Sequence, residues 1–107
     1  MIYELRIYYA MPGKMPALID RFEKHTEALF KELSMECVGY WTEAVGDSSK
    51  FYYMMRFKDQ ADMEKKWQSF RDCGKWPAIA AATEKDGPLI SKAVNTVLRP
   101  TRYSAMK

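Results

Sequence analysis

The sequence predicts a single α+β domain whose elements follow the order strand, helix, strand, strand, helix, strand. Three observations lead to this prediction. Strand-forming residues alternate near both ends of the chain and in its middle. Between these stretches, apolar residues recur at helical spacing. The chain has 107 residues, of which 48% are hydrophobic, and this length suits one core rather than two.

The first half of the chain predicts one strand and one long helix. Strand-forming residues occupy 2–10, and Pro12 with Gly13 ends that strand. Pro16 suits the first turn of a helix, where a missing N–H has no cost. The apolar stripe that follows predicts an uninterrupted helix over residues 15–33.

The middle of the chain predicts an antiparallel hairpin. Residues 36–45 and 51–57 are rich in aromatic and β-branched side chains, which favour strands. The cluster at 46–49, Gly-Asp-Ser-Ser, is typical of a tight turn. The two strands are therefore expected to lie side by side.

The last third predicts a broken helix and a final strand. Asp59 is a suitable N-cap, Gly74 interrupts the helix, and a shorter helix follows over 75–85. Residues 89–98 then predict the fourth strand, while the tail 101–107 has no clear pattern and is expected to be extended. This order is that of the ferredoxin-like fold, a four-stranded antiparallel sheet with helices on one face.

The predicted strands are apolar on both faces, which favours a homodimer. In the first strand, Leu5 and Ile7 lie on one face, while Ile2 and Tyr8 lie on the other. The third strand likewise has apolar side chains on both faces. Helices can cover only one face, and monomers avoid large exposed apolar patches. We therefore expect a second copy against the uncovered face. The alternative is a monomer with amphipathic tyrosines at the sheet edge.

Composition excludes several classes of partner. The net charge of +3 is too small and too evenly spread to favour nucleic acid. Two cysteines and one histidine offer no local zinc motif, and five scattered glycines offer no phosphate loop, so no metal or cofactor is expected. No apolar stretch is long enough to suggest a membrane partner. The strand-like start lacks a targeting pattern, so a cytoplasmic protein with reduced cysteines is expected.

One face of the first strand carries the candidate polar site. Glu4, Arg6 and Tyr8 alternate there, and a buried carboxylate beside a guanidinium must pair or bind something polar. We expect this face to meet the helices, with Arg6 and Tyr8 as candidate catalytic groups. The alternative is a structural ion pair. His25 lies at the border of the helical stripe, where it could act as a general base or a metal ligand. The alternative is a locally packed and hydrogen-bonded side chain.

Aromatic side chains are candidates to line a ligand cavity. Trp41, Tyr53 and Trp67, with Trp76, would form its walls, and Glu4 would bind ligand beside Arg6. The alternative is that these aromatic residues belong to an ordinary core.

Short sequence motifs spread along the chain resemble those of one known family. They are Tyr3-Glu-Leu-Arg-Ile-Tyr8, Pro12-Gly13-Lys14, Phe22-Glu-Lys-His25-Thr26, Val38-Gly-Tyr-Trp-Thr42, Trp67-Gln-Ser-Phe70, Asp86-Gly87-Pro88-Leu89 and Leu98-Arg-Pro-Thr101. In this order they resemble the NIPSNAP domain over nearly the whole chain.

The resemblance implies the dimeric α/β-barrel superfamily, which includes cofactor-free monooxygenases, small isomerases and haem-binding enzymes. In those relatives a ligand pocket commonly lies between sheet and helices, and we expect this chain to bind a small apolar or phenolic molecule in such a pocket. In an enzymatic version, a cofactor-independent monooxygenase or isomerase, His25 or Tyr8 would remove a proton and Arg6 would stabilise the anion. A non-catalytic dimeric scaffold is the other alternative, and haem binding by His25 rests on analogy alone.

Overall fold

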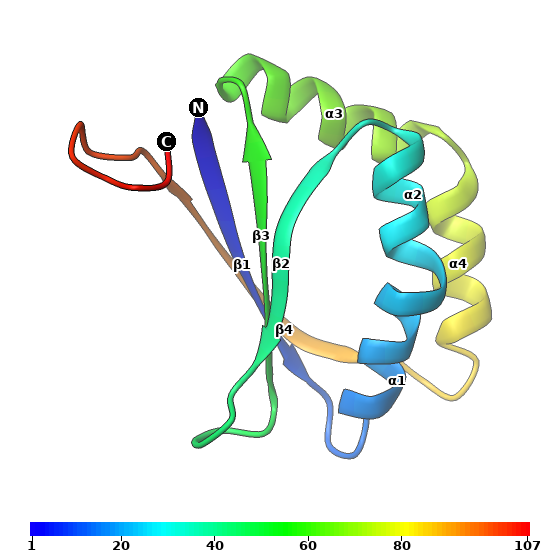
Figure 1. Cartoon of the computed structure of the whole chain (residues 1–107). Helices are drawn as coiled ribbons and strands as arrows, with labels where there is room; N and C mark the ends of the chain where they lie inside the picture. The colour runs from blue at the N-terminus through cyan, green and yellow to red at the C-terminus, as the bar shows by residue number, and fades with distance from the viewer.

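The computed structural model describes residues 1–107 as one sheet covered by helices on a single side (Figure 1). Its four strands are β1 (Ile2–Ala10), β2 (Glu36–Thr42), β3 (Lys50–Phe57) and β4 (Ile90–Leu98). All neighbours are antiparallel, in the order β2-β3-β1-β4. This arrangement confirms the predicted ferredoxin-like α+β fold.

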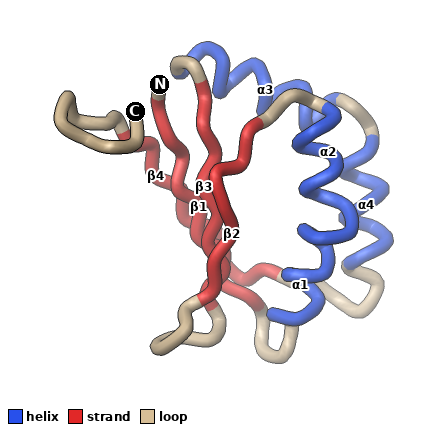
Figure 2. The backbone as a smooth tube through the Cα atoms, in the orientation of Figure 1, coloured by secondary structure: helices blue, strands red, loops and turns tan.

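The helical segments form one layer against the sheet (Figure 2). They are α1 (Met15–Arg21), η1 (Phe22–Thr26), α2 (Glu27–Glu32), α3 (Gln60–Asp72) and α4 (Lys75–Thr83). Asp59 caps α3 as predicted, because its side chain accepts a hydrogen bond from the Asp62 amide at 2.8 Å. Gly74, with φ of 78°, separates α3 from α4 in a conformation that glycine adopts easily. None of these helices has the length and apolarity to cross a bilayer.

The helices cover the sheet face that carries Glu4, Arg6 and Tyr8. In the register of β1 with β3, Glu4 lies opposite Met55, and Arg6 lies opposite Tyr53. Glu4, Tyr53 and Met55 are all buried. The predicted choice of face is therefore confirmed.

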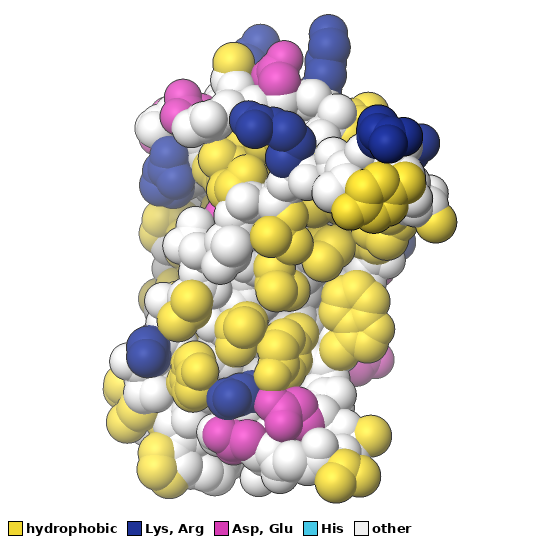
Figure 3. All heavy atoms as spheres, turned by 90° about the vertical axis from the view of Figure 1, so that its left-hand side faces the viewer, with side chains coloured by type: hydrophobic (Ala, Val, Ile, Leu, Met, Phe, Trp, Pro, Cys, Tyr) yellow, Lys and Arg dark blue, Asp and Glu magenta, His cyan; other side chains and the backbone are white.

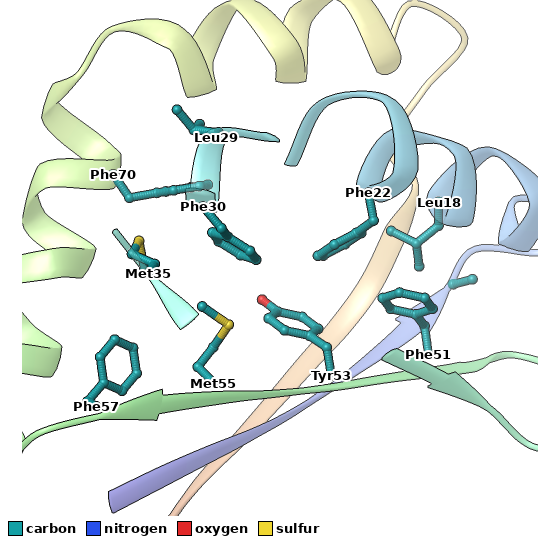
Figure 4. Packing of buried hydrophobic residues seen from close by; sticks show 11 residues of the cluster. Leu18, Phe22, Leu29, Phe30, Met35, Phe51, Tyr53, Met55, Phe57 and Phe70 are labelled. Carbon is teal, nitrogen blue, oxygen red and sulfur yellow. The ribbon is translucent and has the colours of Figure 1, made fainter. Parts of the chain in front are cut away.

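Aromatic side chains dominate the core between the two layers (Figure 4). The Tyr53 hydroxyl points from β3 toward Phe30 on the overlying helix. The ring of Phe22 packs 4.9 Å from that of Tyr53 and 4.8 Å from that of Phe51, centroid to centroid. This packing holds η1 against the middle of the sheet.

The first helix differs from its prediction by one π-helical turn. Residues 15–32 are helical throughout, but Phe22–Thr26 form the wider turn in which hydrogen bonds reach five residues back. The wide turn keeps Phe22 and Thr26 buried together, while His25 faces solvent. Such turns occur often at functional sites.

The hairpin and the tail also depart from expectation. Strand β2 ends at Thr42 rather than at residue 45, because the Glu43 carboxylate turns back to accept a hydrogen bond from the Asp47 amide at 2.8 Å. The tail is not extended, since Arg56 Nη2 donates to the carbonyl oxygen of Lys107 at 3.0 Å. It returns toward the uncovered face of the sheet. Cys37 and Cys73 are both free.

The uncovered face of the sheet displays apolar side chains (Figure 3). Trp41, Val94 and Leu98 are 48%, 36% and 42% exposed, and their register partners place all three on this face. The ring of Trp41 lies against Gly39, where a Cβ atom would come within 2.8 Å of it. We call this surface the open face.

Candidate functional site

A buried carboxylate on β1 organises the polar groups between the layers. Glu4 is 2% exposed. It accepts hydrogen bonds from Arg6 Nη1 at 3.0 Å, Trp67 Nε1 at 2.6 Å and Asn95 Nδ2 at 2.9 Å. These donors come from β1, α3 and β4, so one carboxylate ties three elements together. Its charge is balanced by the Arg6 guanidinium, as a buried ion pair requires.

Arg6 connects this carboxylate to a pair of tyrosines. Its Nη2 atom donates to the Tyr8 hydroxyl at 3.2 Å, and that hydroxyl lies 2.7 Å from the hydroxyl of Tyr53. The guanidinium carbon lies 4.7 Å from the ring centroid of Trp67, within range of a cation–π interaction. Hydrogen bonds at one end and an aromatic face beside it therefore fix the Arg6 side chain.

Of the two hydroxyl hydrogens of Tyr8 and Tyr53, only one has a hydrogen-bond acceptor within the protein. Each hydroxyl carries one hydrogen that it can donate. One of the two hydrogens serves the bond between Tyr8 and Tyr53, and Arg6 supplies its own hydrogen to Tyr8. No protein acceptor lies within reach of the other. The pair therefore offers one O–H donor to any molecule bound beside it.

The ionisation of these groups follows from their surroundings. Burial raises the pKa of Tyr53 well above its ordinary value of 10.0, and the neighbouring Tyr8 raises it further. For Arg6, burial works against the cation, but interactions with Tyr53, Tyr8 and Glu4 outweigh it and raise its pKa. At neutral pH, Tyr53 is therefore a neutral donor and Arg6 is a cation.

An aromatic cavity of about 210 Å³ adjoins this cluster. Its apolar walls come from the helical layer, where Phe22, Phe30, Trp67, Phe70 and Trp76 face it. Phe22 belongs to the π-helical turn, and Trp76 lies in α4. The cavity thus lies between the sheet and the helices.

Polar residues also line the cavity, and two of them carry a buried atom that lacks a partner. Arg6, Tyr8, Tyr53, Thr26 and Arg71 contribute to the lining. Thr26 is 3% exposed, and neither its Oγ1 atom nor the Nε atom of Arg6 has a hydrogen-bond partner. Buried polar atoms are rarely left in this state. A cavity that combines aromatic walls with polar side chains is suited to a bound molecule that carries complementary atoms.

The structure brings some of the predicted site residues together. Arg6, Tyr8, Tyr53 and Trp67 line one cavity, while Glu4 holds Arg6 in place without lining the cavity itself. Glu4 therefore belongs to the support of the site rather than to its ligand-facing surface.

His25 and Trp41 lie outside this site, which corrects the prediction for both. His25 is exposed on the π-helical turn and does not line the cavity. Trp41 pairs with Tyr52 on the open face, on the far side of the sheet from the helices. Its neighbour Tyr40 instead packs against the core.

The sequence reasoning missed Thr26, Arg71 and Asn95. Thr26 interrupts an otherwise apolar stripe, and that signal was visible in the sequence. Asn95 shares the helix-facing side of β4 with Ala93 and Val97, so an amide among apolar residues on that side could have suggested a buried acceptor nearby. Arg71 follows Phe70 near the end of a helix and carries no comparable signal.

Comparisons with known proteins agree with the fold and name a family. The sequence model of the NIPSNAP family matches residues 3–105. A NIPSNAP family protein of unknown function from Agrobacterium tumefaciens is 25% identical with a TM-score of 0.85, covering 100% of this chain and 94% of the other. An uncharacterized NIPSNAP domain protein from Burkholderia xenovorans is 16% identical with a TM-score of 0.85, covering 97% and 98%.

A weaker structural likeness extends to a protein with a different description. A structure from Nitrosomonas europaea, described as a candidate antibiotic biosynthesis monooxygenase, is 12% identical with a TM-score of 0.66 and covers 94% of this chain and 98% of the other. At this identity the likeness shows the shared fold alone. No curated protein sequence matches the chain.

Proposed function

The chain belongs to the NIPSNAP family, and we propose that it binds a small molecule with one aromatic ring in the cavity beside Arg6, Tyr8 and Tyr53. The unused O–H donor of the tyrosine pair, placed in an aromatic cavity, is the observation that carries the proposal. Ligand sites typically combine apolar walls with a few converging polar groups.

The size of the cavity supports a single ring. An apolar cavity of about 150 Å³ accommodates benzene. The cavity here is about 210 Å³, which leaves room for a ring with one small substituent. An oxygen substituent, phenolic or carbonyl, would accept the spare hydrogen bond from Tyr8 or Tyr53.

The alternative is that the protein catalyses a reaction of the bound molecule, but the arrangement of groups favours binding without catalysis. A cofactor-independent oxygenation or isomerisation needs a base that takes a proton from the substrate. His25 is exposed outside the cavity, and Glu4 is engaged by three donors. Tyr8 is left as the candidate, and its oxygen already accepts a hydrogen bond from Arg6.

Paired substitutions at Thr26 test the proposal with phenol as the probe. Thr26→Leu adds volume at the cavity wall and should abolish the rise in melting temperature that phenol causes. Thr26→Val keeps the size of the side chain and removes only its unpartnered hydroxyl, so the rise should persist. If millimolar phenol, benzoate and benzamide all leave the wild-type melting temperature and tryptophan emission unchanged, a non-catalytic scaffold becomes the better description.

We also propose that the protein acts as a homodimer through the open face. Trp41, Val94 and Leu98 expose apolar area on one continuous side of the sheet (Figure 3). A second copy would bury this area in a symmetric contact. Light scattering should therefore give about twice the chain mass of 12.5 kDa, and a mass of one chain at micromolar concentration would contradict the proposal.

A further inference from the structure

The polar lining of the cavity is rich in hydrogen-bond donors and holds no anionic acceptor. Arg6 and Arg71 can only donate, and the tyrosine pair has one hydrogen to give. Thr26 and the tyrosine oxygens could also accept a hydrogen bond. No carboxylate or side-chain amide lines the cavity. A ligand with acceptor atoms therefore finds more partners here than a ligand that brings donors.

The two arginines of the lining differ in how far their charge is balanced. Arg6 is paired with Glu4 at 3.0 Å, so the deep end of the site is close to neutral. Arg71 has no ion pair, and its Nη2 atom donates only to the neutral Gln68 side chain at 3.0 Å. Arg71 is exposed while it also lines the cavity, which places it at the opening. The unbalanced positive charge of the site therefore lies at its mouth.

We propose that the ligand is an aromatic carboxylate whose ring enters the cavity and whose anionic group meets Arg71 at the opening. This inference rests on the proposed binding function and adds the charge of the ligand to it. A guanidinium suits a carboxylate because it can donate two parallel hydrogen bonds to it. At the opening, the carboxylate keeps part of its hydration, which a buried position would remove at a large cost.

Three probes of nearly identical shape separate charge from fit. Benzoate, benzamide and benzamidine are planar and carry a negative, neutral and positive group on the same ring. We expect calorimetric titration to give benzoate the lowest Kd, at least about fivefold below that of benzamide, with benzamidine the weakest. Added salt should weaken benzoate binding and leave benzamide binding unchanged.

A matched pair of substitutions assigns the preference to one residue. Arg71→Gln removes the charge at the opening from an exposed position, so the fold should persist. It should raise the Kd of benzoate to near that of benzamide. Arg102→Gln removes the same charge from the exposed tail, away from the lining, and should change neither Kd.

The outcomes show whether this inference fails alone or whether the proposed function on which it rests fails as well. If benzamide or benzamidine binds as tightly as benzoate, the cavity binds a ring but the charge assignment is wrong. If Arg71→Gln and Arg102→Gln affect benzoate equally, Arg71 does not hold the anion and the inference fails. If none of the three probes binds at millimolar concentration, both the inference and the proposed single-ring site are overturned.

Discussion

Replacing Arg6 with alanine is expected to destabilise the protein by about 3 kcal/mol. The Glu4 side chain is 3% exposed and that of Arg6 is 21% exposed, so the substitution strands a carboxylate away from water. Breaking a buried pair in this way typically costs about 3–5 kcal/mol. Glu4 would keep its bonds from Trp67 and Asn95, which places the expected loss at the lower end.

Urea unfolding followed by circular dichroism measures this loss. With a slope of about 1.5 kcal/mol per molar, a 3 kcal/mol loss lowers the urea midpoint by about 2 M. All variants should be compared at one protein concentration, because association of folded chains adds to stability. Lys24→Ala is the matched control, since Lys24 pairs with Asp20 on the surface, and such pairs contribute about 0–1 kcal/mol.

A double-mutant cycle tests whether the loss comes from the pair itself. In Glu4→Gln with Arg6→Met neither charge remains unpaired, so the double variant should be more stable than the sum of the single losses by about 1.5 kcal/mol or more. The amide oxygen that Glu4→Gln introduces could still accept from Trp67, and the Asn95 amide can turn to present its oxygen. An Arg6→Ala variant within about 0.5 kcal/mol of wild type would refute the reasoning, because that is the behaviour of a solvated residue.

Three further perturbations test neighbouring parts of the structure. Trp67→Phe keeps the ring but removes the N–H bond to Glu4, and urea unfolding should show a loss of about 1–3 kcal/mol. Burial raises the pKa of Tyr53 above its value in the unfolded chain, so the stabilising effect should be full below pH 10 and should fall as the pH rises beyond it. Tyr53→Phe should flatten this alkaline loss of stability, and an unchanged slope of stability against pH would contradict the reasoning. Val94→Lys on the open face should shift the light-scattering mass toward the monomer, whereas Ala17→Lys on the exposed side of α1 should not.

The fold was predictable because its signals are local. The run of strand-forming residues in β1, the cap at Asp59 and the break at Gly74 each follow from the chemistry of a few neighbouring residues. The π-helical turn was not predictable in this way. One wide turn changes the spacing of apolar residues too little to be recognised in the sequence. In the structure, Phe22 at the start of this turn packs against rings from β3.

The candidate site was predictable where a strand presents its residues and less so elsewhere. Arg6 and Tyr8 follow from period two once one face of β1 is buried. Tyr40 and Trp41 are adjacent, so one of them must face away from the helices, and residue size alone does not tell which. In the structure Tyr40 faces the core, Trp41 rests on Gly39, and the register shifts between Cys37 and Gly39.

The network around Glu4 gives the site its rigidity and also limits how the site can be tested. The same carboxylate that positions Arg6 also fastens α3 through Trp67 and β4 through Asn95, so a change at any of these residues alters stability as well as binding. Thr26 and Arg71 line the cavity without belonging to that network. Substitutions at these two positions can change the ligand affinity while the Glu4 network remains intact. Binding measured on them therefore reports on the cavity itself, whereas a loss of binding in an Arg6 variant would combine a lost contact with a loosened sheet.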